Sequence, residues 1–377
     1  MFLRLNFTRF AAGALLLLLV GVFLLSVFGP KNNAPIFYDV YRPASTDSSP
    51  TGRNDTRPPV VLFWTKVFGE APNLNDHCPL ASPCTFTTDR SKFEEADAVV
   101  FHSHDIRVDD LPGGPANSRQ KFVFYSMEAA PALNFISQKT WWKKVLKFHW
   151  VMSYMREAHV RAPYGGFLVE PEVAKQRGFR PIANFSLKIR TWSSSRRSGR
   201  LSGSSRTARR PERIRVAKQL SAHFPVDVGG KCAFNESLRD LCPRNADCDP
   251  LISSYFFYLA FENANCLDYV TEKFDRLLPL PVVPIVLKRS VYQNRPPNSA
   301  HLRRLMDTPA EFFKLLEWRN RWAKADWNAD GYRMGICGLC ERLQKERHTK
   351  TPVIPDLKRF YRTNSPCWSV MNAEWSQ

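Results

Sequence analysis

Acidic residues are scarce in this 377-residue chain: 35 Asp and Glu stand against 54 Lys and Arg, which gives a formal net charge of +19. A surface with this balance suits an anionic partner, such as nucleic acid, a lipid headgroup, a sulfated glycan or a nucleotide-phosphate substrate. Hydrophobic residues make up 44% of the chain, which excludes global disorder. The length accommodates two domains of about 150 residues each.

The chain also lacks a second Cys-x-x-Cys motif. Cys337 and Cys340 form the single such pair, while Cys78 and Cys84 are spaced too widely to complete a typical zinc site. Structural disulfides are therefore favoured over a zinc site or a redox pair. The total of nine cysteines is odd, so at least one thiol is free or is paired between chains.

The one long apolar run lacks a good cleavage site. Residues Phe10–Phe28 are apolar apart from Ser26 and are preceded by Arg4 and Arg9. As a helix this run measures about 28 Å, close to the hydrocarbon thickness of a bilayer. It therefore predicts an uncleaved membrane anchor rather than a cleaved signal peptide, with the first nine residues cytosolic and the remainder lumenal.

A lumenal location has two consequences. The Asn-x-Ser/Thr sites at Asn54, Asn184 and Asn235 become accessible for N-glycosylation. The same location argues against nucleic acid as the anionic partner. It also places the cysteines in an oxidising compartment, which again favours disulfides.

Short apolar runs beyond the stem predict an α/β fold. Parallel strands are expected at 60–64, 98–101, 122–125 and 148–154, and a second set at 256–261 and 282–287. A helix is expected at 269–278, and Thr308-Pro309 predicts the start of another. The expected organisation is a cytosolic tail at 1–9, an anchor at 10–28, a stem at 29–57, a first lobe at 58–170, a linker at 171–210, a second lobe at 211–345 and a C-terminal tail at 346–377.

The linker contains a tract with no strand pattern. Residues 192–210 hold seven Ser and six Arg. A solvated loop is the expected structure, and a polybasic docking patch or a lost piece of coding sequence are the alternatives.

Residues 261–273 combine groups that can bind a diphosphate. Tyr269, Glu272 and Lys273 are spaced to share one face of a helix whose expected N-cap is Asp268. The first turn of a helix favours an anion, Lys273 adds a positive charge, and Glu272 can accept hydrogen bonds from sugar hydroxyls. An ordinary amphipathic helix with a surface Glu–Lys pair would show the same spacing.

Several segments resemble the α1,3-fucosyltransferase family (glycosyltransferase family 10), in order from about Pro59 to Leu343. The segments that carry this resemblance are Tyr125–Pro131, Trp150–Arg156, Pro163–Gly165, Pro225–Cys232, Phe257–Asn263, Asp268–Phe274, Val282–Leu287 and Cys337–Cys340.

The resemblance implies a GT-B-type Golgi enzyme with two Rossmann-like lobes that transfers L-fucose from GDP-fucose to a GlcNAc hydroxyl of a glycoprotein or glycolipid, with inversion. Glu128 matches the position of the general base. The positions expected to contact the donor are Arg213, with Arg215 as the next candidate, Asn263, Tyr269, Glu272 and Lys273.

Three further expectations accompany the resemblance. Cys337 and Cys340 pair with one another or with the Cys78/Cys84 region. His102 and His104 are possible acceptor contacts, although histidines at a strand end are more often structural. No metal or other cofactor is required, and Asp247-Cys248-Asp249 is only a weak match to a metal-binding motif.

The chain departs from the family pattern at two places. The Ser/Arg tract replaces a hydrophobic strand of the second lobe, and a short segment is missing near Asn298–Ala300. These departures leave open an alternative: a catalytically impaired, membrane-anchored protein that binds a glycan or nucleotide sugar. A glycosyltransferase that uses another GDP-sugar is a further alternative.

Overall fold

The computed structural model describes residues 57–72, 74, 84–133, 146–164, 168–169, 201–204, 211–243, 246–287, 299–317, 323–324 and 331–368. None of the helices within these ranges is both long and apolar enough to cross a membrane. The predicted anchor at 10–28, all of the predicted stem at 29–57 except its last residue, and the residues Asn54, Cys78 and Asn184 lie outside the described residues.

The first lobe is a six-stranded parallel sheet. Its order is β2-β1-β3-β4-β5-β6, with β1 Val60–Phe63, β2 Thr85–Thr87, β3 Ala98–His102, β4 Lys121–Ser126, β5 Trp150–Ser153 and β6 Val160–Arg161. The strands predicted at 60–64, 98–101, 122–125 and 148–154 are confirmed, with shorter bounds in the first and last cases.

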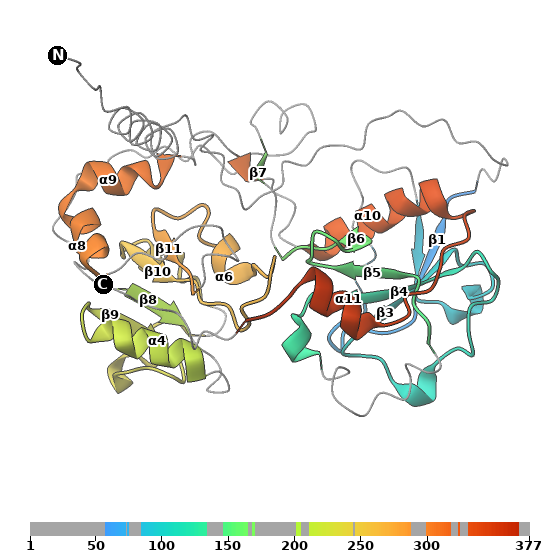
Figure 1. The fold of residues 1–377 in the computed structure, drawn as a ribbon, viewed down its shortest axis with the longest axis horizontal. Coiled ribbons are helices and arrows are strands. Elements are labelled where there is room, and N and C mark those ends of the chain that lie inside the picture. The colour runs from blue at the N-terminus through green and yellow to red at the C-terminus, as the bar shows by residue number, and fades with distance from the viewer. Residues whose placement is uncertain are drawn as a thin grey trace, which may run out of the picture. The chain divides into compact units, whose positions relative to one another are not determined.

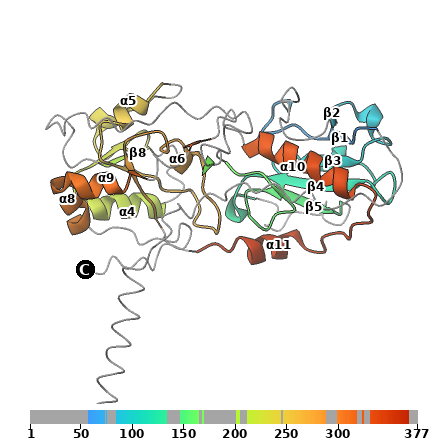
Figure 2. The same ribbon diagram turned by 90° about the horizontal axis from the view of Figure 1, so that it is seen from above.

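The first sheet is buried on both faces because its strands carry apolar side chains in both directions. Phe122 and Phe124 point to one face, where α11 (Leu357–Asn364) adds Leu357 and Tyr361. Val123 and Tyr125 point to the other, where α10 (Gly331–Glu346) adds Ile336, Leu339 and Leu343. Figure 1 and Figure 2 show the two helices on opposite sides of the sheet.

A glycine allows α10 to lie close to the first sheet. A Cβ placed on Gly335 would come within 2.7 Å of the Ala162 Cβ and 3.1 Å of the Met152 sulfur. Any larger residue would push the helix away from β5 and β6. Residues 331–364 were expected in the second lobe and the C-terminal tail; their apolar side chains instead complete the core of the first sheet.

The second lobe is a four-stranded parallel sheet. Its order is β11-β10-β8-β9, with β8 Leu201–Ser204, β9 Val226–Gly229, β10 Phe257–Leu259 and β11 Val283–Ile285. One face packs on α4 (Pro211–Ser221), α8 (Ser299–Asp307) and α9 (Pro309–Lys314). The other packs on α5 (Asp249–Ile252) and on α6 (Glu272–Asp275) with the turn after it.

The Ser/Arg tract supplies the strand that we expected to be missing. Leu201–Ser204 lies between β10 and β9, with Leu201 opposite both Phe257 and Val226. The expectation of a featureless loop across 192–210 was therefore wrong for these four residues. Backbone pairing on both sides substitutes for the apolar side chains that identify a buried strand in a sequence.

The remaining described elements are small. β7 (Leu168–Val169) and β12 (Ala323–Lys324) form a two-stranded antiparallel sheet. Single 3₁₀ turns occur at η1 Arg90–Lys92, η2 Val108–Asp110, η3 Ala130–Ala132 and η5 Glu236–Leu238. The predicted helix start at Thr308-Pro309 is confirmed, since Thr308 is the N-cap of α9.

Candidate active site

Glu128 lies just beyond the carboxyl end of a central strand of the first sheet. Strand β4 is buried along its whole length and ends at Ser126, and Glu128 is half-buried two residues later. The Glu128 N–H donates to Ser126 Oγ at 3.2 Å, which fixes the turn out of the strand. Ligands of parallel α/β sheets bind at this edge, so Glu128 is well placed to meet a substrate.

Two tyrosines hold the two carboxyl oxygens of Glu128. The Tyr164 hydroxyl donates to Oε1 at 3.3 Å and the Tyr269 hydroxyl donates to Oε2 at 3.2 Å. Burial raises the pKa of both phenols, and the nearby Glu128 charge contributes in the same direction. Both phenols therefore stay protonated and act as donors to a carboxylate whose remaining lone pairs can accept a proton.

Tyr269 is not on the helix that the sequence predicted. The helix α6 begins at Glu272 with Thr271 as its N-cap, and Asp268 has a positive φ of 63°. The expectation of a helix from 269 to 278 with Asp268 as N-cap was wrong. Tyr269 precedes the helix, and its ring packs into the core of the first sheet with Tyr154, at 4.9 Å between ring centroids.

Lys273 is surrounded by oxygen atoms at the start of α6. Its Nζ lies 2.7 Å from Glu272 Oε1, 2.8 Å from Thr271 Oγ1 and 3.5 Å from Glu262 Oε2. Burial works against the ammonium charge, but the carboxylates of Glu262 and Glu272 outweigh it and raise the pKa of Lys273. A charged, partly exposed lysine at this position can neutralise a phosphate oxygen.

Glu262 is a site residue that the sequence analysis did not single out. It is only 4% exposed, and its two carboxyl oxygens accept from the Thr271 N–H at 2.8 Å and the Thr271 hydroxyl at 2.6 Å. Burial raises its pKa, against the attraction of Lys273. Its role is to fix the turn that begins α6. The sequence signal for Glu262 was its place immediately before Asn263, in the Phe257–Asn263 segment that resembles the fucosyltransferase family.

Arg213, on helix α4, contacts the segment that contains Glu262 and Lys273. It is buried on α4, and its Nη1 donates to the Phe261 carbonyl oxygen at 3.4 Å. Asn263 follows two residues later, and its Oδ1 is buried with no hydrogen-bond partner among the described residues. The structure thus gathers Arg213, Asn263 and Lys273 at the carboxyl end of β10.

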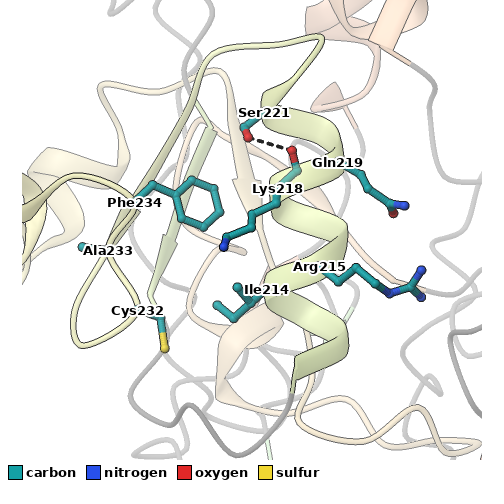
Figure 3. Close-up of a pocket in the computed structure, with 8 residues that line it drawn as sticks. All are labelled: Ile214, Arg215, Lys218, Gln219, Ser221, Cys232, Ala233 and Phe234. Atoms are coloured by element: carbon teal, nitrogen blue, oxygen red, sulfur yellow. Dashed lines mark hydrogen bonds between the residues drawn. The ribbon is translucent and has the colours of Figure 1, made fainter.

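Arg215, the second candidate for a phosphate contact, lies elsewhere on α4. It is exposed and lines an open hollow between α4 and the loop that carries Cys232 and Phe234. Lys218 extends toward that loop (Figure 3). Within the described residues Arg213, and not Arg215, contacts the Phe261–Lys273 segment, so the geometry favours Arg213.

His102 has a structural environment. It is fully buried, and its Nδ1 lies 2.5 Å from Asp105 Oδ2. Its backbone N–H donates to Thr65 Oγ1 at 2.7 Å. Burial lowers its pKa, against the attraction of Asp105. The His104 ring stacks on it at 5.6 Å. The exposed ring of Phe68 lies 4.4 Å from His102. Acceptor contacts by His102 and His104 stay a prediction.

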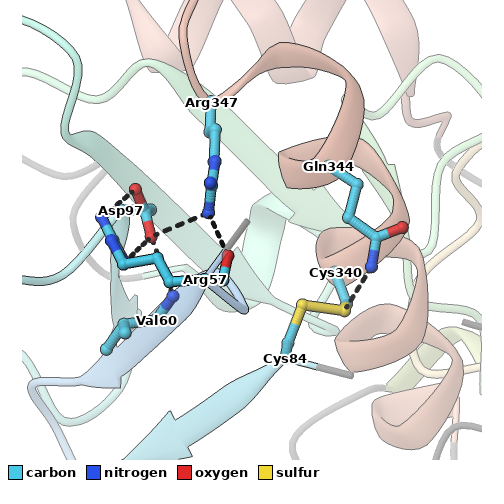
Figure 4. The surroundings of a disulfide bond; sticks show 7 residues. All are labelled: Arg57, Val60, Cys84, Asp97, Cys340, Gln344 and Arg347. Carbon is cyan, nitrogen blue, oxygen red and sulfur yellow. Dashed lines mark hydrogen bonds and ion pairs between the residues drawn. A yellow bond between two sulfur atoms is a disulfide. The ribbon is translucent and has the colours of Figure 1, made fainter. Parts of the chain in front are cut away.

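A disulfide joins α10 to the edge of the first sheet. Cys340 pairs with Cys84, so Cys337 and Cys340 are not bonded to each other (Figure 4). Cys337 is also disulfide-bonded. Beside this bond, Arg347 donates to the Arg57 carbonyl oxygen at 2.9 Å. The second of the two expected pairings is therefore correct for Cys340.

Two other disulfides had not been assigned from the sequence. They join Cys242 to Cys248 and Cys266 to Cys367. Cys232 is the free thiol of the described part of the chain, in agreement with the odd total of cysteines.

Asn235 and Asp249 make no hydrogen bond or ion pair with Glu128 or Lys273 in the described part of the chain. Asn235 is exposed at the N-cap of η5, where its Oδ1 accepts from the Ser237 N–H. Asp249 pairs with Arg276 at 2.7 Å. The described residues contain no group of three or more acidic, His or Cys side chains arranged to hold a metal ion.

The site combines a carboxylate that is held by two phenols with two cations: Lys273, four residues after Tyr269, and Arg213 on α4. These are the parts of a group-transfer enzyme with an anionic leaving group. A family model described as "Fucosyltransferase, N-terminal" matches residues 56–165, and one described as "Glycosyltransferase family 10 (fucosyltransferase) C-term" matches residues 194–360. The chain belongs to this family of glycosyltransferases.

Relatives of the chain carry related names. "Alpha-(1,3)-fucosyltransferase fut-5" of Caenorhabditis elegans is 28% identical over 336 residues, which are 82% of this chain and 84% of that protein. Human "4-galactosyl-N-acetylglucosaminide 3-alpha-L-fucosyltransferase FUT6" is 28% identical over 340 residues, covering 83% and 86%. A crystal structure of an alpha1,3-fucosyltransferase with GDP-fucose aligns with a TM-score of 0.44 at 15% identity, covering 84% and 96%.

Proposed function

We propose that the chain is an inverting α1,3-fucosyltransferase that transfers L-fucose from GDP-fucose to a GlcNAc hydroxyl of a glycoprotein or glycolipid glycan. The observation that carries this proposal is a direct contact between the proposed proton acceptor and the segment proposed to bind the diphosphate. Tyr269 donates to Glu128, and the same short segment continues into Thr271, Glu272 and Lys273.

In the proposed reaction, Glu128 accepts the proton of the acceptor hydroxyl as its oxygen bonds to the anomeric carbon of fucose. The bond from that carbon to the β-phosphate oxygen breaks on the opposite face, and GDP leaves with the bonding electrons. Lys273 and Arg213 stabilise the charge that develops on the diphosphate. The passage through an oxocarbenium-like state resembles that of inverting glycosidases.

The test is a radiolabelled fucose-transfer assay on the full chain, with GDP-fucose and a panel of core N-glycan and lactosamine acceptors. Glu128→Gln removes the proton acceptor with little change in shape, and we expect transfer to fall by about 10²- to 10⁴-fold. Glu95→Gln is the control, because Glu95 is exposed and pairs with Lys92 at the surface. Undiminished transfer by Glu128→Gln would contradict the assignment of the base.

The catalytically impaired binding protein is the alternative outcome. Its main support was the apparent loss of a central strand, and β8 now occupies that place. The alternative predicts that GDP-fucose binds, as measured by calorimetry, while no acceptor is fucosylated. GDP-mannose in the same binding experiment distinguishes a fucose donor site from a site for another GDP-sugar.

We further propose a type II Golgi membrane location with a lumenal catalytic region, and transfer that requires no metal. The support for the first is the apolar run at 10–28 with its N-terminal arginines. Glycosidase-sensitive glycans at Asn54, Asn184 or exposed Asn235 would support the lumenal orientation, and their absence from all three sites would oppose it. Undiminished transfer in excess EDTA would support metal independence.

A further inference from the structure

The segment that carries Tyr269 is fastened to the end of the chain. Cys266 is bonded to Cys367, and the backbones on either side pair as an antiparallel bridge. The Leu267 N–H donates to the Pro366 carbonyl at 3.0 Å, and the Trp368 N–H donates to the Asn265 carbonyl at 2.9 Å. We call residues Ser365–Trp368 the C-terminal clasp.

The clasp is in turn fixed to the first sheet. The Ser365 hydroxyl donates to the Leu267 carbonyl at 2.7 Å and lies 2.8 Å from the Tyr154 hydroxyl, which follows β5 directly. Ser365 and Tyr154 are both fully buried or nearly so. The helix α11, which precedes the clasp, packs Tyr361 into the core of the first sheet.

A third attachment restrains the turn itself. Arg156 donates from its backbone N–H and its Nε to the carboxylate of Asp268, at 3.1 and 2.9 Å. Asp268 holds the left-handed conformation that turns the chain toward Tyr269. Tyr269 is then packed between the rings of Tyr154 and Tyr164. Its hydroxyl therefore has little freedom to leave Glu128.

We propose that the C-terminal clasp and its disulfide to Cys266 are a positioning element for the general base: they fix Tyr269, and through it they align the carboxylate of Glu128. This inference rests on the proposed function, because the alignment of Glu128 matters for the transfer of fucose. Cys266, Cys367 and Ser365 contact no reacting atom. They act through Tyr269.

The test is a double-mutant cycle on the full chain. The paired substitution Cys266→Ser and Cys367→Ser removes the disulfide without leaving an unpaired thiol, and we expect kcat for fucose transfer to fall about tenfold. In a Tyr269→Phe background the same pair should lower kcat by less than about twofold, because the hydroxyl that the clasp positions is already absent. Equal losses in the two backgrounds would overturn the proposal.

The matched control is the pair Cys84→Ser and Cys340→Ser, which removes the disulfide that joins α10 to the edge of the first sheet. We expect it to leave kcat within about twofold of the unmodified chain. A loss equal to that of the Cys266/Cys367 pair would show a general effect of cysteine removal and would overturn the specific role of the clasp.

Hydrogen exchange provides a readout that does not depend on turnover. Removal of the clasp disulfide should speed amide exchange in residues 265–270, and removal of the Cys84–Cys340 disulfide should not. If the unmodified chain transfers no fucose, the proposed function fails, and the exchange experiment alone decides the clasp. Unchanged exchange in 265–270 would overturn the clasp whether or not the chain is active.

Discussion

The two parallel sheets are built from different kinds of strand. In the first sheet, β3 and β4 are buried at every position, and each is an apolar run that is recognisable in the sequence. In the second sheet, the interior strand β8 reads Leu-Ser-Gly-Ser and is defined by its two neighbours, β9 and β10. Side chains therefore specify the first sheet, whereas backbone pairing specifies β8 of the second.

The strongest way to sharpen this contrast is to remove a large side chain from the first sheet. Phe124 is fully buried between Phe148 and Tyr361. We expect Phe124→Ala to lower the free energy of unfolding by about 3–5 kcal/mol, measured by denaturant titration. Val353→Ala, at a position that is 41% exposed, is the control. A loss below about 1 kcal/mol for Phe124→Ala would show a core less closely packed than the contacts indicate.

Acid should also weaken the first sheet. His149 is buried, and its Nδ1 accepts from the Phe122 N–H at 2.9 Å. Burial, with a smaller effect of the Lys121 charge, lowers the pKa of His149 to about 4. The unfolded chain, with a histidine pKa of about 6.5, therefore binds this proton more readily than the folded chain.

Stability from neutral His149 is thus complete above about pH 6.5 and is lost as the pH falls toward 4, by up to about 3 kcal/mol. Unfolding titrations between pH 7.5 and 4.5 measure this loss. His149→Gln should reduce the slope over this interval. Identical slopes for the variant and the unmodified chain would assign the acid sensitivity to other groups.

A proline tests whether backbone pairing holds the second sheet together. Ser202 lies opposite both Tyr258 and Asp227, and Ser202→Pro removes an N–H from a strand that has neighbours on both sides. We expect a loss of about 1–3 kcal/mol, with weaker GDP-fucose binding. Hydrogen exchange should increase in β9 and β10 and stay low in β4. Ser202→Ala, which keeps the N–H, is the control.

The same contrast explains what the sequence could and could not predict. Val60–Phe63 and Lys121–Ser126 are buried on both faces, so their apolar runs identified them. Leu201–Ser204 has no such run, and its pairing partners lie 25 and more residues away along the chain. No local pattern could reveal it.

Some residues of the candidate site could be predicted from the sequence, and others could not. Glu128 was predicted because the segment that contains it resembles a known family, and Lys273 was predicted from its charge and spacing as well as from that resemblance. The position of Tyr269 could not be found in this way, because it depends on contacts with Tyr154 and on the distant Cys367, which is 101 residues from its partner Cys266. Periodicity placed Tyr269 on a helix, and those tertiary contacts keep it off one.

The smallest expected effect concerns the other phenol of the base. Tyr164 belongs to the first lobe, and its hydroxyl donates to Glu128 Oε1 at 3.3 Å. Tyr164→Phe removes this hydrogen bond to the base, so we expect kcat/KM for fucose transfer to fall about 2- to 10-fold.

Tyr361→Phe is the matched control for this change. Its hydroxyl is also buried but donates to Ser153 Oγ, at 3.4 Å, rather than to Glu128. A loss of kcat/KM in Tyr164→Phe alone would mean that the first lobe positions its own base, with Tyr269 supplying the second donor from the segment that leads into α6. Equal losses in both variants would mean that the effect arises from general loosening of the core, and that the contact between Tyr164 and Glu128 contributes nothing specific to proton transfer.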